Sequence, residues 1–188
     1  MQQFPAGMIG GPPHSGKSVL VYSLTQLLRD RKVEHYVLRA CPDGEGDFSQ
    51  EADQTTVRNL RHKGQFTPAY IERICEALDG RLLSLLVDVG GKPQPPQEVI
   101  FARCTHAILL SSTSKGLDEW RVRAQRHGMT VIAELHSDLH GVDAITMMSP
   151  LLTGTIAGLE RGQRVTGSMV TALCDALQRL FDYPESEL

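Results

Sequence analysis

The sequence predicts an α/β fold in which a parallel five-stranded sheet is covered by helices on both faces. Short apolar runs alternate with amphipathic helical patterns along most of the chain, which is typical of a sheet buried between two helical layers. Near the N-terminus, the glycine-containing segment Gly11–Ser18 joins an apolar strand to a helical pattern. Because 188 residues suffice for one well-buried core, we expect a single domain over residues 1–188.

The expected strands and helices follow one another in regular alternation. The five expected strands cover residues 6–10, 35–40, 82–88, 105–110 and 129–135. Helical patterns cover residues 19–29, 67–78, 96–103, 117–127 and 166–181. Thr67 and Pro68 mark a helix start, because threonine caps free amides and proline fits the first helical position. Between the last strand and the last helix, we expect a glycine-containing turn over residues 154–162, in which residues 159–162 close over a bound base.

The segment Gly11–Ser18 matches the pattern G-x-x-x-x-G-K-[ST] at every fixed position. Glycines at 11 and 16 let the backbone curl so that its N–H groups point inward, and a helix N-terminus adds its positive dipole. The pattern therefore predicts a phosphate-binding loop, in which a solvent-facing Lys17 reaches the β- and γ-phosphates and the Ser18 hydroxyl enters the shell of Mg²⁺. The predicted cofactor-binding residues are Gly11, Pro13, His14, Ser15, Gly16, Lys17, Ser18, Val19 and Gly91. For His14 the alternative is an exposed loop residue whose backbone matters more than its ring.

Asp88 ends the nearly continuous apolar run of residues 82–88. A carboxylate at the end of a buried strand is costly unless a cation or hydrogen-bond donors compensate it. Beside a phosphate loop, hydrated Mg²⁺ is the expected partner. We therefore predict Ser18 and Asp88 as metal ligands and Asp88 as a catalytic residue.

The polar segment after the second expected strand provides a second candidate. Residues 43–47 alternate carboxylates with glycines at the sheet edge where ligands of open α/β sheets bind. Asp43 is therefore a predicted catalytic residue that orients water, and the alternative is a solvated acidic turn. Arg58 and Arg61 follow in a weak helical pattern, which is either a lid over the phosphates or a solvated helix face.

Two further segments bear on the ligand. The guanine-reading pattern N-K-x-D is missing after the fourth expected strand, where residues 114–118 have other residue types and spacing. ATP is therefore the expected nucleotide. Residues 134–140 and Asp143 carry histidines and carboxylates that either bind a metal or lie as polar groups on a loop at the ligand edge.

Composition excludes several classes of protein. A formal net charge of −3 disfavours general nucleic-acid binding and membrane-surface binding. The 4 cysteines are far apart in the sequence, which suits a reducing compartment and disfavours a zinc ribbon. Neither a membrane span nor a signal peptide is evident, so we expect a cytoplasmic protein.

With these motifs, residues from about 5 to 181 resemble the P-loop NTPase superfamily, and more closely its kinase and GTPase-like division. That resemblance implies a strand order of roughly 2-3-1-4-5 and a Gly91 amide that senses the γ-phosphate, because Asp88-x-x-Gly91 resembles the switch pattern of these proteins. Residues 10–19 and 39–47 look like the ATPase-like domain, labelled AAA, that is attached to some CRISPR-associated ring nucleases. This narrower resemblance implies a role in antiviral defence and a ring-nuclease partner. Ring-nuclease activity itself is not carried over.

Three functions are compatible with these observations. The first is a slow Mg²⁺-dependent ATPase that acts as a nucleotide-controlled accessory domain, working as a homo-oligomer or with a CRISPR-associated partner. The second is a small-molecule or nucleoside kinase, whose substrate pocket would be lined by residues 43–65. The third is a non-catalytic module that binds nucleotide only to assemble.

Overall fold

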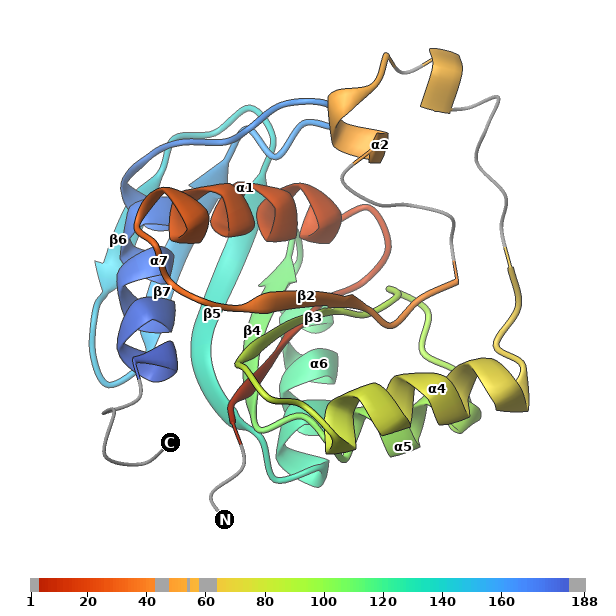
Figure 1. Cartoon of the computed structure of the whole chain (residues 1–188). Coiled ribbons are helices and arrows are strands. Elements are labelled where there is room, and N and C mark those ends of the chain that lie inside the picture. Colours follow the sequence, from red (N-terminus) through yellow and green to blue (C-terminus); the bar gives the residue numbers. More distant parts are fainter. Residues whose placement is uncertain (1–3, 43–47, 54, 58–63, 183–188) are drawn as a thin grey trace.

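The computed structural model describes residues 4–42, 48–53, 55–57 and 64–182. Its centre is a seven-stranded sheet with the order β2-β3-β1-β4-β5-β7-β6 (Figure 1). Every neighbouring pair is parallel except β6 and β7, which are antiparallel. The strands are β1 Ala6–Gly10, β2 Tyr36–Arg39, β3 Leu85–Asp88, β4 His106–Ser111, β5 Thr130–Asp138, β6 Ala144–Met147 and β7 Leu152–Ala157.

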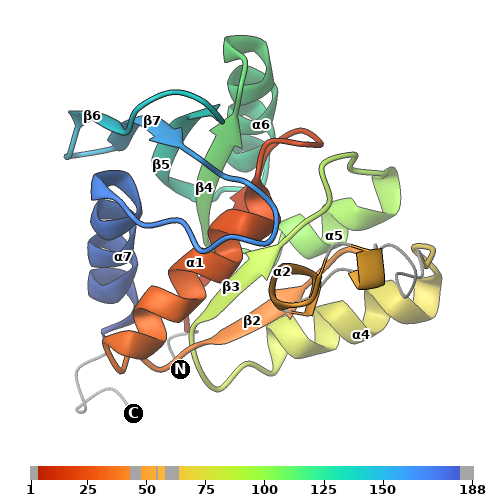
Figure 2. The same ribbon diagram turned by 90° about the horizontal axis from the view of Figure 1, so that it is seen from above.

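Helices cover both faces of the sheet, as predicted (Figure 2). They are α1 Lys17–Asp30, α2 Phe48–Glu51, α4 Pro68–Asp79, α5 Glu98–Phe101, α6 Ser114–Arg126 and α7 Ser168–Phe181, with a 3₁₀ turn at Pro95–Gln97. Side chains of α1 and α7 form one apolar cluster, and side chains of α4, α5 and α6 form the other. Successive side chains of a strand point to opposite faces of the sheet. In β1, Ile9 therefore belongs to the first cluster and Met8 to the second.

The expected number of five strands is wrong, since the sheet continues beyond β5 with β7 and then β6. The order of the first five strands is the expected 2-3-1-4-5. The expected turn over residues 154–162 is partly strand, because β7 extends to Ala157. Gly154 fits this strand because a Cβ there would lie 2.0 Å from the carbonyl oxygen of Ala144 on β6.

Two helices begin at a threonine that caps the first turn. The Thr67 hydroxyl accepts a hydrogen bond from the Tyr70 amide at 3.2 Å, which confirms the predicted cap of α4. Helix α6 begins three residues earlier than expected, because Thr113 caps it through the Gly116 amide at 3.1 Å. Among the described residues, no helix combines the length and the apolar character that crossing a membrane requires.

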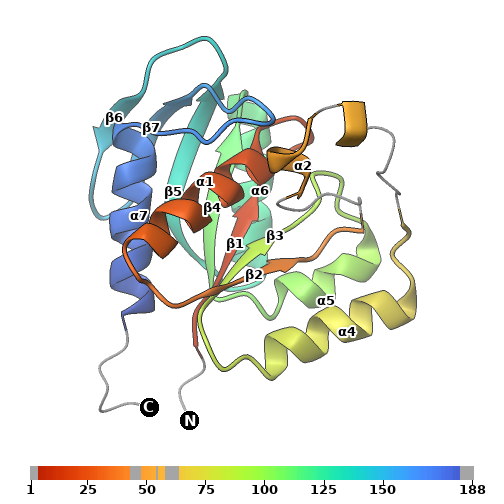
Figure 3. The same ribbon diagram turned by 45° about the horizontal axis from the view of Figure 1, so that its top comes forward.

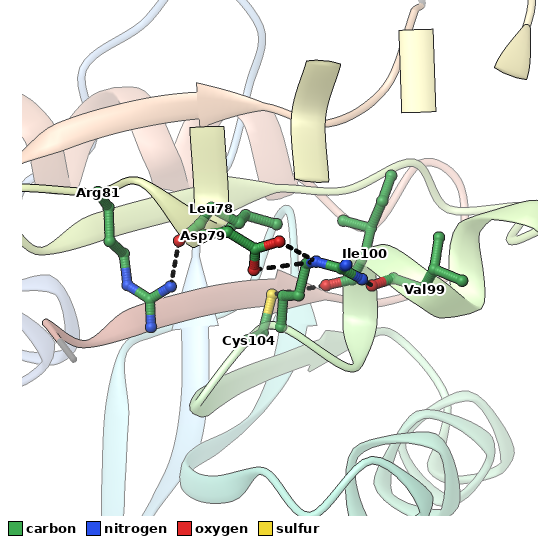
Figure 4. A network of polar contacts seen from close by, with 7 residues as sticks. Leu78, Asp79, Arg81, Val99, Ile100 and Cys104 are labelled. Atoms are coloured by element: carbon green, nitrogen blue, oxygen red, sulfur yellow. Dashed lines mark hydrogen bonds and ion pairs between the residues drawn. The ribbon is translucent and has the colours of Figure 1, made fainter. Parts of the chain in front are cut away.

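Arginines tie the C-terminal end of α4 to its neighbours (Figure 4). Arg81 is 7% exposed and donates to the carbonyl oxygen of Leu78, one of the last carbonyls of the helix. Arg103, just after α5, binds the Asp79 carboxylate through Nε at 2.9 Å and the Val99 carbonyl through Nη1 at 2.8 Å. These bonds satisfy groups that a helix end leaves free, and they fix α4 against α5.

Candidate functional site

The segment between β1 and α1 forms a tight loop at the C-terminal end of β1, which lies between β3 and β4 in the sheet. Gly16 precedes α1 with a φ of 87°, a left-handed conformation that glycine adopts without strain. A Cβ on Gly16 would also lie 2.6 Å from Cβ of Leu159, which follows β7. A larger residue at position 16 would therefore strain the loop and push Leu159 away.

Two side chains close the loop on itself. Ser15 Oγ donates a hydrogen bond to the Pro12 carbonyl at 2.9 Å, and Lys17 Nζ donates to the same carbonyl at 2.7 Å. Lys17 is only 8% exposed, so the expectation of a solvent-facing lysine is wrong. The reason is local, because the loop folds around the ammonium and offers it the Pro12 carbonyl oxygen. To reach a phosphate, the ammonium must exchange this carbonyl for a phosphate oxygen.

A pocket of about 360 Å³ lies at the N-terminal end of α1. Its lining comprises Pro13, His14, Gly16, Lys17, Ser18, Val19, Gln50, Gly91, Leu159 and Arg161. Seven of the nine predicted cofactor-binding residues are therefore brought together around one cavity. The other two do not line it, because Gly11 is buried directly after β1 and Ser15 is turned inward with 2% exposure. Nucleotide contact by any of the nine stays a prediction.

Two glycines hold the loop against its neighbours. A Cβ on Gly11 would lie 2.0 Å from the Leu110 carbonyl oxygen of β4. A Cβ on Gly91 would lie 2.4 Å from the backbone nitrogen of Pro13. The segment after β3 therefore packs directly on the phosphate loop, and only glycine permits this approach at position 91.

Asp88 ends β3 beside Arg39, which ends β2 in the same register. Its carboxylate is 5% exposed, and its Oδ2 accepts from Arg39 Nη1 at 2.6 Å. Hydrated Mg²⁺ was the expected partner of this charge, and the partner that the structure shows is a guanidinium of the neighbouring strand. Asp88 does not line the 360 Å³ pocket. Its metal-binding and catalytic roles stay predictions.

The sequence offered one signal for this ion pair that was missed. Arg39 is the last residue but one of the strand predicted at residues 35–40, and the strand predicted at residues 82–88 ends at Asp88. Once β2 and β3 are known to be adjacent, the two opposite charges at equal register predict the pair. Arg39 Nη2 is also buried and finds no acceptor among the residues that the structure describes.

Several predicted site residues fall outside the described ranges. Asp43, with Glu45 and Asp47, lies in the gap between residues 42 and 48, and Arg58 and Arg61 lie in the gap between 57 and 64. The catalytic role of Asp43 and the lid role of the arginines stay predictions.

Two other segments complete the pocket wall. Gln50 comes from α2, and Leu159 and Arg161 come from the loop after β7 (Figure 3). The loop was expected to close over a base, and the structure places it beside the phosphate loop. Gln50 was not predicted, because it lies in a polar stretch without a motif and reaches the pocket only through the fold.

Two carboxylates of residues 134–143 hold neighbouring elements together. Glu134 lies in β5 and binds Arg121 of α6 through two hydrogen bonds of 2.6 Å. Asp143 accepts from the Ala157 amide at 2.9 Å and from the Met169 amide at 3.2 Å. Within the described ranges, no group of three or more His, Cys, Asp or Glu residues is arranged to hold a metal ion. The metal alternative for this segment is therefore not supported.

Comparison with known proteins gives a distant structural match. No family model matches the chain, and no curated protein sequence matches it. Among solved structures, the kinase domain of the Escherichia coli tyrosine kinase ETK is similar, with a TM-score of 0.49 and 12% identity. The match covers 88% of this chain and 71% of that chain. A similarity this low carries no functional conclusion.

Proposed function

We propose that the chain binds ATP with Mg²⁺ in the 360 Å³ pocket and hydrolyses it slowly, as a nucleotide-controlled accessory domain. The observation that carries this proposal is the pocket at the start of α1, where the loop Gly11–Ser18 places a lysine and a hydroxyl at a helix N-terminus. Such a terminus offers backbone N–H groups and a positive dipole to an anion. Phosphate is the anion that the loop sequence favours.

The residues present fit a magnesium nucleotide in chemical type. Ser18 and Asp88 offer the hard oxygen ligands that Mg²⁺ takes, and they are the residues that would hold it. When bound, the ion neutralises charge on the phosphates. Lys17 would exchange its bond with the Pro12 carbonyl for a phosphate oxygen. Arg39 would hold the Asp88 carboxylate in place through its ion pair.

The preference for ATP over GTP is supported by the segment after β4. There, Ser111 Oγ accepts a hydrogen bond from the Thr113 amide at 3.1 Å, and Thr113 Oγ1 accepts from the Gly116 amide. These side chains are used to start α6. The segment has a serine where the N-K-x-D pattern has asparagine, and its Asp118 lies at the wrong spacing, so the pattern that reads guanine is missing.

The experiment is calorimetric titration with ATP, ADP and GTP, each with and without Mg²⁺, followed by assay of phosphate release. We expect Mg²⁺-dependent binding of ATP, weaker binding of GTP, and slow release of phosphate. Absence of binding by all three nucleotides would overturn the proposal. Binding without phosphate release would leave the non-catalytic assembly module as the function.

A kinase is the second candidate, because Gln50 brings the segment after β2 to the pocket. A kinase needs a second substrate beside the terminal phosphate, and this segment is where such a substrate would bind. The test is product analysis with sugar, polyol and nucleoside acceptors. Acceptor-dependent consumption of ATP, with a phosphorylated product, would favour the kinase over the ATPase.

The ring-nuclease partner is proposed from the resemblance of residues 10–19 and 39–47 alone. Its test is direct: ATP turnover by the chain is measured alone and with an added CRISPR-associated ring nuclease. We expect turnover to change on addition, and constant turnover with no co-elution would remove the partner from the proposal.

A further inference from the structure

The pocket wall contains one buried amide whose orientation is fixed. Gln50 is 4% exposed, and its Oε1 accepts a hydrogen bond from the Gly162 amide at 3.1 Å. Because this oxygen is the acceptor, the other end of the amide is the NH₂ donor. That Nε2 atom is buried and finds no acceptor in the described part of the chain. A buried donor without an acceptor is costly, so a bound group that supplies one would be favoured.

The surroundings of Gln50 identify the kind of acceptor. The same pocket is lined by Lys17 and Ser18 at the start of α1, where positive potential gathers. An amide donor in such a pocket pairs best with an anionic oxygen, because charged acceptors make the stronger hydrogen bonds. A phosphate oxygen of the nucleotide meets this requirement.

The position of Gln50 in the fold indicates which phosphate of the nucleotide it would contact. Gln50 follows β2 and Gly91 follows β3, and both strands lie on the same side of β1. Both residues line the pocket together with Lys17, whose ammonium serves the β- and γ-phosphates in a loop of this sequence. We propose that the Gln50 amide donates to the terminal phosphate and thereby discriminates a nucleoside triphosphate from a diphosphate. This inference rests on the proposed nucleotide binding and adds a specificity-determining residue to it.

A purely structural role for Gln50 gives a different expectation. In that role, only the bond from the Gly162 amide to Oε1 matters. Gln50→Glu keeps an acceptor for Gly162 but removes the NH₂ donor and adds a negative charge. The substitution therefore separates the two roles, provided that affinities for ATP and ADP are both measured.

The experiment is calorimetric titration of wild type and Gln50→Glu with Mg²⁺–ATP and Mg²⁺–ADP. We expect ATP affinity to fall by about tenfold or more, because a charge-assisted bond becomes a repulsion, while ADP affinity changes by less than about threefold. Gln97→Glu is the matched control. Gln97 is also fully buried, with Oε1 bonded to the Gln94 amide at 2.7 Å and Nε2 without an acceptor among the described residues, but it does not line the pocket. The control should leave both affinities unchanged.

Gln50→Met covers the case in which the glutamate variant does not fold. Methionine has similar length and no donor, so ATP affinity should fall by about threefold while ADP affinity is retained. Equal losses for ATP and ADP, or no loss in a folded variant, would overturn the inference while the proposed function stands. Wild type that binds neither nucleotide would overturn both, and this result is distinct from the others.

Discussion

Lys17 and Asp88 are charged side chains with almost no exposed surface, and each has a partner a short distance away. Lys17 is held by the Pro12 carbonyl of its own loop, and Asp88 by Arg39 of the neighbouring strand. Buried charges are tolerated only when they are paired or hydrogen-bonded. Both residues are therefore held in place by the protein, and substitutions at either site will change stability as well as binding.

Lys17→Ala should weaken ATP binding by about tenfold or more, because the loop loses the ammonium that pairs with the phosphates. Some loss of thermal stability is expected too, since the Pro12 carbonyl loses a hydrogen bond. Calorimetry measures the affinity, and circular dichroism checks the fold. The matched control is Lys115→Ala on α6, whose side chain is 87% exposed and pairs only at 3.9 Å with Glu119. Unchanged ATP affinity in a folded Lys17→Ala variant would show that the loop does not bind phosphate.

Asp88→Asn should reduce ATP turnover by at least about tenfold while nucleotide affinity changes less. It should also destabilise the protein by about 2 kcal/mol or more, because Arg39 loses its carboxylate in a largely buried pair. Arg39→Met separates the two effects, since it breaks the same pair but keeps the Asp88 charge. Phosphate release and urea unfolding are measured for both variants. Equal turnover of wild type and Asp88→Asn would move the metal role to Asp43 or Glu45.

Among the helices and strands, the sequence predicted those that are marked by a local pattern of apolar residues or by a capping residue. Strand β1 is continuously apolar, and β3 is apolar up to Asp88, because both faces of these strands are buried. The cap at Thr67 is a local hydrogen bond. Strand β6 is exposed throughout, so its residues show no burial pattern. Strand β7 contains Gly154, which reads as a turn residue and is required only because β6 lies close. Strands β6 and β7 were therefore missed for physical reasons: pairing rather than side-chain burial defines β6, and β7 is interrupted by a glycine that only the pairing with β6 explains.

The close contact between the loop Gly11–Ser18 and the segment after β3 can be tested by an alanine substitution, which adds a single methyl group. Gly91→Ala should weaken ATP binding by about tenfold, because its Cβ would lie 2.4 Å from the Pro13 nitrogen and must displace the loop. Gly7→Ala is the control, since a Cβ there makes its nearest contact at an ordinary 3.7 Å. Titration with Mg²⁺–ATP measures both variants. If the two alanines have the same effect, the packing of position 91 does not shape the pocket.

At the scale of the whole molecule, four separate segments build the pocket. The segment Gly11–Ser18 is one continuous motif, so the sequence alone singled it out as a candidate. Gln50, Gly91 and Arg161 follow three different strands and meet it only because β2, β3 and β7 take their places in the sheet. Of these, Gly91 could be predicted from its spacing after Asp88. Gln50 has no such signal, and only the fold assigns it to the site.

Stability should fall between pH 7 and pH 5, because burial lowers the pKa of His35 and of His106 below the ordinary 6.5. In this range the unfolded chain binds more protons than the folded chain, so acid favours unfolding. His35 Nδ1 lies 2.8 Å from the Val33 carbonyl, and an asparagine amide can replace that donor without titrating. His35→Asn should therefore reduce the difference between unfolding free energies measured in urea at pH 7 and pH 5. An unchanged difference would show that His35 does not contribute.

The last prediction concerns whether one chain suffices for turnover. Arg161 lines the pocket of its own chain, so Arg161→Ala should lower ATP turnover by the same factor at every protein concentration. If the chain instead works as a homo-oligomer, Arg58 or Arg61 of a second copy adds a positive charge to the site. An arginine supplied in this way raises the rate of hydrolysis by about 10³-fold or more. Specific activity should then rise with concentration, and it should lose this rise in Arg58→Ala or Arg61→Ala. Mixing Lys17→Ala with the affected arginine variant provides the control, because each then supplies what the other lacks and activity returns. Specific activity that is independent of protein concentration in all variants would show that a single chain suffices for ATP hydrolysis. Turnover that requires an added small-molecule acceptor would instead show that the chain is a kinase.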